Sequence, residues 1–324
     1  MKYFLGADLG GTKTHTLVID ETGTVLGFGE SGPGNHEVVG FDGMFDAMQM
    51  SMEQALNAAG LTKADIAGAG YGVAGFDWPS EYDDMAKTID RLALSAPYKF
   101  VNDAVPGLVA GSEDGWGIVV VSGTGSNCRG WDKEHKREGG VSGHGQLMGE
   151  NAGASELMFR CMQLVGYAWS KRGPMTKLAD VFIEKVGAKD LEDLIEGYTM
   201  YEYKIDASFA PLVFQVAEEG DQVARDLIHW AGTELGEMIN GVIRQLDFKD
   251  LAFDVVMAGS MFEGGPMLID PMRETTLKFA PKARFVRLDA PPVLGATILG
   301  IESAGMQVTK DIRNRMKESI KAIR

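Results

Sequence analysis

Cysteine is scarce in this sequence. The chain has 324 residues and only two cysteines, Cys128 and Cys161, which lie far apart along it. Two cysteines do not make a disulfide framework, and neither lies in a C-x-x-C or H-E-x-x-H pattern that would indicate zinc. Cys161 also falls on an apolar stripe with helical spacing, which indicates a core thiol. The sequence therefore argues against a disulfide-rich scaffold and gives no sign of a zinc site.

Long hydrophobic runs are also missing. No stretch approaches the roughly 20 apolar residues of a membrane span. The first residues run directly into a strand pattern and lack the apolar core and cleavage site of a signal peptide. We therefore expect a protein of the reducing cytoplasm that does not bind membranes.

An excess of positive charge is the third absence. The formal net charge is −15, whereas nucleic acids and anionic membranes require a basic surface on their partner. We expect neither as a partner. Any phosphate ligand must then be held locally, by backbone N–H groups, helix N-termini and a metal ion.

What the sequence does have is apolar residues and glycine. Hydrophobic residues make up 45% of the chain and charged residues 24%, and there are 42 glycines. This balance and length suit two globular domains with large cores. Many glycines stand in short clusters beside apolar runs, which indicates turns under steric demand.

Hydrophobic periodicity predicts an α/β protein whose pattern restarts near residue 116. Before that point it predicts strands at 3–8, 14–19, 24–29, 66–73 and 98–101 and helices at 41–59, 82–94 and 105–110. After it, the pattern predicts strands at 116–121, 253–257 and 284–287, helices within 154–229, and further helices at 233–245, at 293–303 and at the end of the chain. We expect one lobe of residues 1–112, a second of 113–303, and a C-terminal helix within 304–324 that packs back on the first.

The turn Asp8-Leu9-Gly10-Gly11-Thr12-Lys13-Thr14 lies between the first two predicted strands. A glycine pair lets the backbone approach a phosphate closely, and Asp8 could hold Mg²⁺ through water. The spacing is not that of a Walker A loop. An ordinary glycine hairpin would read the same way, so this turn alone leaves both interpretations open.

A second turn, at 122–126, repeats the pattern after the next buried strand. Gly123 and Gly125 leave two N–H groups accessible, and Ser122, Thr124 and Ser126 supply hydroxyls. Two such turns facing one cleft would hold a triphosphate from both sides. A third glycine loop at 258–265 follows the strand at 253–257 and could accept a flat adenine or a ribose, although it could equally be a plain connection.

Asn102-Asp103 ends a predicted strand and precedes a helix. A carboxylate at this place is well positioned to accept a proton from a substrate hydroxyl during phosphoryl transfer. The alternative is that Asp103 caps the helix that follows. Both interpretations remain open at the level of sequence.

In combination, these motifs resemble the two phosphate motifs and the adenosine motif of the actin/hexokinase/Hsp70 ATPase superfamily, in the same order. Within it the chain is similar to the BadF/BadG/BcrA/BcrD family, and most of all to its N-acetylglucosamine kinases. The stretches that carry this likeness are Gly34-Asn35-His36, Asn102-Asp103-Ala104, Gly123–Arg129 and Pro292–Ala296. The resemblance implies two ribonuclease H-like lobes with a nucleotide cleft between them.

The resemblance also implies roles for individual residues. Those implied for ATP are Asp8, Gly10, Gly11, Thr12, Lys13, Gly123, Thr124, Gly125, Ser126, Gly259 and Ser260, with Asp8 holding Mg²⁺ through water. Those implied for the sugar are Asn35, His36, Asp103, Thr124, Gly143, His144 and Glu150. Asp103 would take the proton from the sugar's hydroxymethyl group, whose oxygen would then attack the γ-phosphate of MgATP.

The stretch 143–153 departs from the family pattern. The family reads Gly-Trp-Gly, three residues, then Gly-Asp-Glu-Gly-Ser at the sugar pocket. Here His144 replaces the tryptophan and Glu150 replaces the aspartate. Glutamate is longer by one methylene, which changes where its carboxylate reaches. The expected substrate is N-acetylglucosamine or a related hexosamine, and this stretch leaves open which one.

Two other functions fit the same superfamily. One is an ATPase that activates a dehydratase or reductase through an Fe–S cluster held by cysteines of a dimer. The other is a non-catalytic sensor of a sugar or nucleotide, for which no DNA-binding segment is evident before Tyr3. Family analogy also suggests a homodimer.

Overall fold

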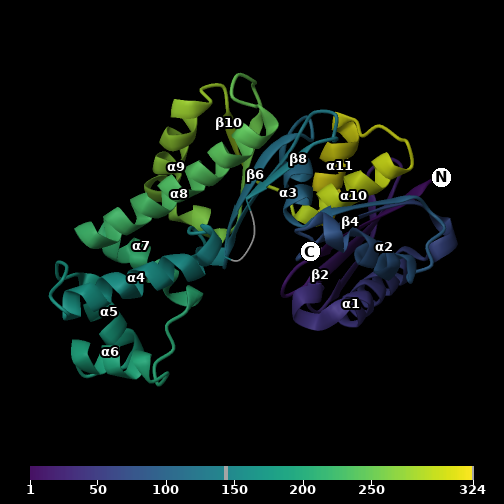
Figure 1. The fold of residues 1–324 in the computed structure, drawn as a ribbon. Coiled ribbons are helices and arrows are strands. Elements are labelled where there is room, and N and C mark those ends of the chain that lie inside the picture. Colours follow the sequence, from purple (N-terminus) through teal and green to yellow (C-terminus); the bar gives the residue numbers. More distant parts are fainter. Residues whose placement is uncertain (142–144, 323–324) are drawn as a thin grey trace. The chain divides into compact units, whose positions relative to one another are not determined.

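The protein is described by a computed structural model that covers residues 1–141 and 145–322 (Figure 1). The chain divides into two compact units. The first contains Met1–Val119, Gly130–Arg137 and Val286–Arg324, and the second contains Val120–Arg129 and Glu138–Phe285.

Both units combine strands and helices. The strands are β1 (Tyr3–Leu9), β2 (Thr14–Asp20), β3 (Val25–Ser31), β4 (Ile66–Val73), β5 (Tyr98–Asn102), β6 (Gly117–Ser122), β7 (Ser126–Trp131), β8 (Glu138–Val141), β9 (Asp254–Ala258) and β10 (Arg284–Arg287). The helices are α1 (His36–Ala59), α2 (Tyr82–Asp90), α3 (Ala104–Gly111), α4 (Ala154–Trp169), α5 (Lys177–Val186), α6 (Leu191–Thr199), α7 (Ala210–Glu218), α8 (Gln222–Leu246), α9 (Pro266–Phe279), α10 (Pro292–Ser303) and α11 (Lys310–Ile320).

The sheet of the first unit has the strand order β3-β2-β1-β4-β5. β1 to β3 form an antiparallel meander, and β4 and β5 run parallel to β1. Leu9, Val73 and Asn102 are in register at the carboxyl ends of the three parallel strands. Residues that follow these strands therefore meet at one edge of the sheet, where ligands of α/β sheets bind.

Helices α1 and α10 cover opposite faces of this sheet (Figure 1). Glycines permit the close approach on both faces. A Cβ at Gly29 would lie 1.9 Å from the Ser51 carbonyl oxygen of α1, and a Cβ at Gly6 would lie 2.2 Å from the Thr297 nitrogen of α10. No side chain fits at such distances, so these positions require glycine for packing.

The boundary between the units differs from the sequence prediction. We expected 113–303 in the second lobe, but α10 lies in the first unit, together with α11. α10 packs on β1, β4 and α3, and this packing uses Gly6 and Gly70 of the first sheet. The sequence concealed this because those glycines resemble ordinary strand interruptions until the helix that they face is known.

The sheet of the second unit has the order β10-β9-β6-β7-β8. If β6 is aligned with β1, this order matches that of the first sheet. The helix predicted at 233–245 is part of one long helix, α8, which begins at Gln222 after the N-cap residue Asp221. Within residues 1–141 and 145–322, no helix combines the length and apolarity needed to cross a bilayer.

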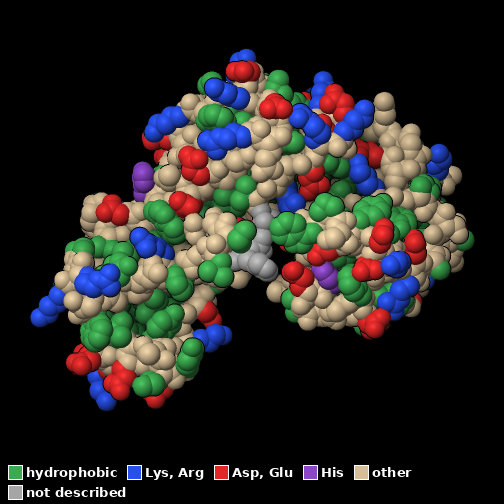
Figure 2. Space-filling model, viewed as in Figure 1, with side chains coloured by type: hydrophobic (Ala, Val, Ile, Leu, Met, Phe, Trp, Pro, Cys, Tyr) green, Lys and Arg blue, Asp and Glu red, His purple; other side chains and the backbone are tan. Residues whose placement is uncertain are grey.

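Charged side chains of both signs are interspersed over the face drawn in Figure 2. Lysine and arginine lie among aspartate and glutamate and do not gather into one broad basic area on that face. This distribution is in keeping with the net charge of −15.

Candidate active site

The glycine turn of the first unit is a closed hairpin between β1 and β2. Leu9 pairs with Thr14 at the end of the ladder, and the Gly10 N–H donates to the Lys13 carbonyl oxygen over 2.9 Å. A Cβ placed on Gly11 would meet no atom within 4 Å. The tip of this turn is therefore exposed backbone that a ligand can approach closely.

Two carboxylates stand beside this turn. Asp8 precedes the last residue of β1, and Asp103 follows the last residue of β5. Asp8 is half-buried. Loss of hydration at this position, reinforced by the negative charge of Asp103, raises the pKa of Asp8 from 3.8 to about 8. Such an acid lacks a compensating cation, and perturbed acids of this kind cluster at functional sites.

Asp103 does not cap helix α3 with its side chain. The neighbouring side chain takes that role, because the Asn102 Oδ1 accepts from the Ala104 N–H over 3.0 Å. The Asn102 Nδ2 also donates to the Phe76 carbonyl oxygen and to Asp77, at 3.1 and 3.0 Å. Asn102 thus ties the end of β5 to the loop after β4, and Asp103 occupies the N-cap position of α3 without a side-chain capping hydrogen bond.

Asn35 and His36 lie at the start of α1, close to the same sheet edge. The Asn35 Oδ1 caps the helix by accepting from the Glu37 N–H over 2.8 Å. Both side chains contact Gly75, where a Cβ would lie 2.5 Å from the Asn35 Oδ1 and 3.0 Å from the His36 ring. Gly75 has a φ of +81°. The loop after β4 therefore holds the two predicted sugar-binding residues in place.

His36 is further positioned by two contacts. Its ring stacks on Phe41 with centroids 4.8 Å apart, and its Nε2 lies 3.7 Å from the Glu81 Oε1. The other oxygen of Glu81 accepts from the N–H groups of Asp77 and Trp78, each over 2.9 Å. No sequence pattern predicts that Glu81 joins the loop after β4 to His36, because Glu81 and His36 lie far apart along the chain.

Lys13 points toward the neighbouring strand. Its Nζ lies 3.3 Å from the Glu30 Oε1 of β3, and both side chains are well exposed. Thr14, by contrast, is fully buried, and its Oγ1 has no hydrogen-bond partner within the part of the chain that the structure describes. Of the two residues, Lys13 was predicted to bind ATP, and its partner in the structure is a glutamate.

The glycine turn of the second unit is built against the N-terminus of α4. The Gly123 N–H donates to the Gly125 carbonyl oxygen over 2.9 Å. The first N–H groups of the helix, at Ala154 and Ser155, donate to the Gly123 and Thr124 carbonyl oxygens over 2.8 and 2.9 Å. The turn and the positive end of the helix thus lie together, but the Ala154 and Ser155 N–H groups are occupied by carbonyl oxygens of the turn, so the helix would act on an anion through its dipole.

Two further glycines fit closely under this turn. A Cβ at Gly153 would lie 2.4 Å from the Gly125 carbonyl carbon, and a Cβ at Gly259 would lie 2.1 Å from the Ser122 carbonyl oxygen. Gly259 also has a φ of +106°. The predicted adenosine motif therefore touches the predicted phosphate turn within one unit, and the contact depends on glycine.

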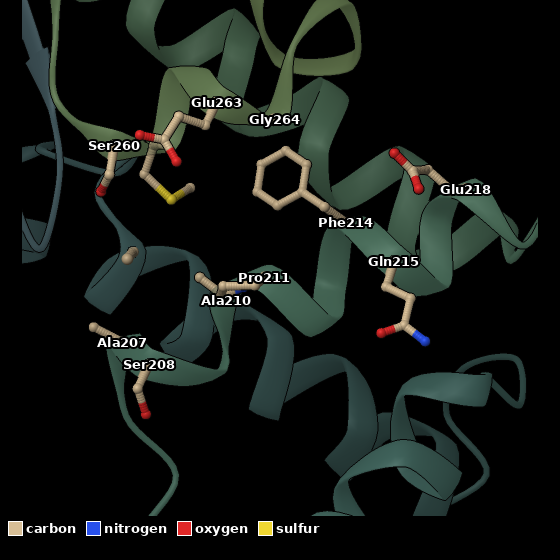
Figure 3. A pocket seen from close by; sticks show the side chains of 12 residues that line it. Ala207, Ser208, Ala210, Pro211, Phe214, Gln215, Glu218, Ser260, Glu263 and Gly264 are labelled. Atoms are coloured by element: carbon tan, nitrogen blue, oxygen red, sulfur yellow. The ribbon is translucent and has the colours of Figure 1, made fainter.

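A pocket of about 410 Å³ opens beside Ser260 (Figure 3). Its apolar lining comes from α4, from α7 and the segment before it, and from the segment after β9, and it consists of Ala154, Ala207, Ala210, Pro211, Phe214 and Met261. Its polar lining consists of Ser208, Gln215, Glu218, Ser260 and Glu263. This size and character suit a small organic ligand.

The Phe214 ring lies against the backbone of Gly264, where a Cβ would come 2.2 Å from a ring carbon. In Figure 3 the ring stands in the middle of the pocket wall, with Ser260 and Glu263 on one side and Gln215 and Glu218 on the other. No lysine, arginine or histidine of the described residues lines the pocket. It is therefore suited to a nucleoside, and less to its phosphates.

The sugar motif at 143–153 is only partly visible. Gly143 and His144 lie outside the described residues. Glu150 is buried, and its Oε2 accepts from the Gly145 N–H over 2.8 Å. The adjacent Asn151 donates through its Nδ2 to Glu234 of α8 over 2.9 Å. Glu150 therefore shapes this loop from within.

The structure thus gathers the predicted residues into two groups. Asp8, the first glycine turn, Asn35, His36 and Asp103 belong to the first unit, and the second glycine turn, Glu150, Gly259 and Ser260 belong to the second. Their roles toward ligands stay predictions. Sequence reasoning missed the lining from α7, because Phe214 and its neighbours read as an ordinary amphipathic helix.

Comparison with known sequences defines the class of protein. The sequence matches the BadF/BadG/BcrA/BcrD ATPase family over residues 5–300. The chain therefore belongs to this family, as the motifs predicted.

Three individual proteins are similar to this chain over nearly its whole length. The chain is 28% identical over 321 residues to the N-acetyl-D-glucosamine kinase of Dictyostelium discoideum, covering 93% of this chain and 98% of that protein. It is 27% identical over 304 residues to the N-acetylmuramic acid/N-acetylglucosamine kinase of Clostridium acetobutylicum, covering 92% and 98%. A crystal structure of a candidate N-acetylglucosamine kinase from Chromobacterium violaceum has the same fold, with a TM-score of 0.64, 23% identity, and 92% and 99% of the chains covered.

Proposed function

We propose that this protein is an ATP-dependent sugar kinase that phosphorylates a hydroxyl of an amino sugar, N-acetylglucosamine or a related hexosamine. The observation that carries the proposal is the acid pair Asp8 and Asp103, which stands beside an exposed glycine turn at one edge of the first sheet. One acid can serve the metal of the nucleotide, and the other can serve the hydroxyl that is phosphorylated.

In this proposal, each of the two units binds a different part of the substrates. The second supplies the pocket of Figure 3 for adenosine, and its glycine turn supplies backbone N–H groups for phosphate beside the positive end of α4. Glu263, in the wall of the pocket, can accept hydrogen bonds from ribose hydroxyls. The first unit supplies the acid pair and the sugar-binding residues Asn35 and His36.

Asp103 acts as the general base. Its carboxylate accepts the proton of the sugar's hydroxymethyl group as that oxygen attacks the γ-phosphorus, and the bond to the β,γ-bridging oxygen breaks to release ADP. Asn102 positions Asp103, because the hydrogen bonds of the Asn102 side chain to Phe76, Asp77 and Ala104 fix the backbone immediately before Asp103. Positioning and charge stabilisation supply most of the rate enhancement in phosphoryl transfer.

Asp8 fits a magnesium ion. An oxygen ligand whose pKa is raised to about 8 by burial and by a second carboxylate regains its charged form when a divalent cation lies beside it. When bound, Mg²⁺ would neutralise charge on the phosphates of the nucleotide. Asp8 would hold it directly or through water.

The Fe–S activator gains no support from the cysteines. Cys128 and Cys161 are both fully buried in the second unit. Burial raises the pKa of the Cys161 thiol to about 12 and that of Cys128 further, which disfavours the thiolate that binds iron. The cluster ligands of an activator would need to be exposed thiolates at the surface of the subunit.

The test is a kinase assay with a panel of acceptors. Purified protein is incubated with ATP and Mg²⁺ and with N-acetylglucosamine, N-acetylmuramic acid, glucosamine, glucose or no sugar, and both ADP and sugar phosphate are measured. We expect ADP and phosphorylated amino sugar to form in equal amounts. ADP release that is the same with and without every acceptor would contradict the proposal.

A further inference from the structure

Glu156 lies close under the glycine turn of the second unit, although none of the predicted motifs includes it. It is in the first turn of α4, whose N-cap residue is Gly153. A Cβ placed on Gly153 would lie 2.4 Å from the Glu156 Oε2 and 2.4 Å from the Gly125 carbonyl carbon. Both atoms therefore border the same small space, so a carboxyl group is a near neighbour of the turn that we propose for phosphate.

The carboxyl group of Glu156 is poorly hydrated in this position. Its Oε2 is buried and accepts no hydrogen bond within residues 1–141 and 145–322. Burial raises the pKa of Glu156, although the N–H groups of Glu156 and Gly153 favour its charged form, and the negative charge of Glu150 raises the pKa further. A buried carboxyl group of this kind responds strongly to any further charge that binds nearby.

No cation of the described residues counters the charge of Glu156. Arg160, one turn further along α4, lies over an indole ring of α8. Glu150 and Glu234 accept hydrogen bonds from the loop that precedes α4. The loop after β9 contributes Glu263, which lines the pocket of Figure 3. The surroundings of Glu156 are therefore acidic, and a bound polyanion would add to them.

We propose that Glu156 takes up a proton when the phosphates of ATP bind the turn at 123–125. This inference rests on the proposed function, because it requires that turn to be the phosphate site. When it is charged, the carboxylate caps the first turn of α4, as a glutamate at the third position of a helix does by reaching back to the N-cap.

Bound phosphate changes this balance. Its oxygens would repel the Glu156 carboxylate across a partly buried region, where charges are screened less than in water. A proton taken from solvent removes the repulsion. Binding of ATP and protonation of Glu156 therefore favour each other, and the affinity of the wild-type protein for ATP falls as Glu156 becomes ionised.

The experiment measures ATP binding by isothermal titration calorimetry of the full-length protein with Mg²⁺ from pH 5 to pH 8. Pairs of buffers that differ in ionisation enthalpy give the number of protons bound per ATP. Glu156→Gln keeps the shape of the side chain but cannot take up the proton, and subtracting its value removes the protons that ATP and Asp8 gain or lose. We expect wild type to bind up to roughly half a proton more per ATP than this variant.

The same titrations give the two affinities. At pH 8 Glu156→Gln should bind ATP about 10-fold more tightly than wild type, because the repelling charge is absent. The two affinities should converge as the pH falls toward 5, since the wild-type carboxyl group then gains its proton. A residue that only supports the fold would not make the ratio depend on pH in this way.

Two further variants make the result specific. Glu184→Gln removes the same charge from an exposed glutamate of α5 in the same unit, and it should match wild type at every pH because solvent screens that charge. Glu156→Met fills the buried space with a side chain that has no acid or amide. It should lose the extra proton as Glu156→Gln does, and it serves as the test if Glu156→Gln does not fold. Thermal denaturation checks the folding of each variant.

Two kinds of outcome separate this inference from the proposed function. If Glu156→Gln binds as many protons per ATP as wild type, or if its advantage in affinity is the same at pH 5 and pH 8, the assignment of the proton to Glu156 fails and the kinase proposal stands. The assignment also fails if Glu184→Gln behaves like Glu156→Gln. If wild-type protein binds no ATP, both proposals fail.

Discussion

The two glycine turns occupy equivalent places in two sheets of the same strand order, yet they differ in charge. The first turn follows β1 and includes Asp8, with Asp103 nearby. The second follows β6, which ends at Ser122, and the Ser122 hydroxyl donates to the Ala152 carbonyl oxygen. The first turn includes an acid of its own, whereas the residues of the second turn supply backbone and hydroxyls.

This difference suits a nucleotide that carries a metal ion. Both turns can offer N–H groups to phosphate oxygens, but carboxylates in both would repel the phosphates. The second turn carries no acid among its own residues, and the N-terminus of α4 adds positive character beside it, although the Glu156 carboxylate also lies close to Gly153 under this turn. The repeated sheet thus supports two different tasks through a few substitutions at one place.

The largest effect is expected at the acid that has no counterpart in the second unit. Asp103→Asn should lower kcat by about 10²–10⁴-fold, because the amide cannot accept the hydroxyl proton. ATP affinity, measured by calorimetry, should stay near the wild-type value. If the variant retains full turnover, Asp103 is not the general base, and the acids beside the first turn do not explain how it differs from the second.

Asp8→Asn tests the other acid. Between about pH 4 and pH 8, Asp8 is protonated in the folded protein but ionised in the unfolded chain. The free energy of unfolding therefore falls as pH rises through this window. Without Mg²⁺, the variant should therefore gain stability over wild type from pH 5 to pH 8, by about 1–3 kcal/mol. Urea unfolding at both pH values measures this gain.

The matched control for that experiment is Asp46→Asn, a change at an exposed aspartate of α1. It should change stability by less than about 0.5 kcal/mol at either pH. If Asp8→Asn is no more stabilising at pH 8 than at pH 5, the Asp8 carboxyl is charged in the folded protein and its place beside Asp103 needs another explanation.

A pair of alanine substitutions separates glycines that packing requires from glycines that a ligand requires. Gly259→Ala should destabilise the protein by about 1–3 kcal/mol, since its φ is +106° and its Cβ would clash with Ser122. Gly11→Ala should cost less than about 0.5 kcal/mol, because nothing lies within 4 Å. Equal losses in urea unfolding would show that the first turn is packed as tightly as the second.

The smallest effects are expected at two hydroxyls that occupy matching places. Thr14 begins β2 and Ser126 begins β7, and neither side-chain oxygen has a hydrogen-bond partner in the described parts of the chain. Thr14→Val and Ser126→Ala should therefore leave the free energy of unfolding within about 0.5 kcal/mol of wild type, or raise it slightly. A loss above about 1 kcal/mol in either variant would reveal a partner for that hydroxyl.

Local signals in the sequence were enough to place the turns. Apolar runs ended at Asp8 and Ser122, and the glycines after them indicated turns, so the turns and the acid after β5 were predicted from neighbours along the chain. The family resemblance then supplied their order and the fold of two lobes.

Features that depend on distant contacts were not predictable. The Glu81–His36 contact and the α7 wall of the pocket unite residues whose spacing carries no signal. Asp103 occupies the N-cap position of α3, as one alternative expected, but the side chain that accepts from the Ala104 N–H is that of Asn102. Asn102 also bonds to the loop at Asp77, a contact that the sequence pattern does not reveal.

The way α10 joins the first unit has a consequence for synthesis. Most residues of the second unit form one continuous segment, Glu138–Phe285, whereas the first unit needs α10, which follows that segment in the chain. During synthesis, the sheet face containing Gly6 and Gly70 is therefore completed by its covering helix only after the whole second unit has been made. We expect the first unit to finish folding after the second, although domains usually fold in order from the N-terminus.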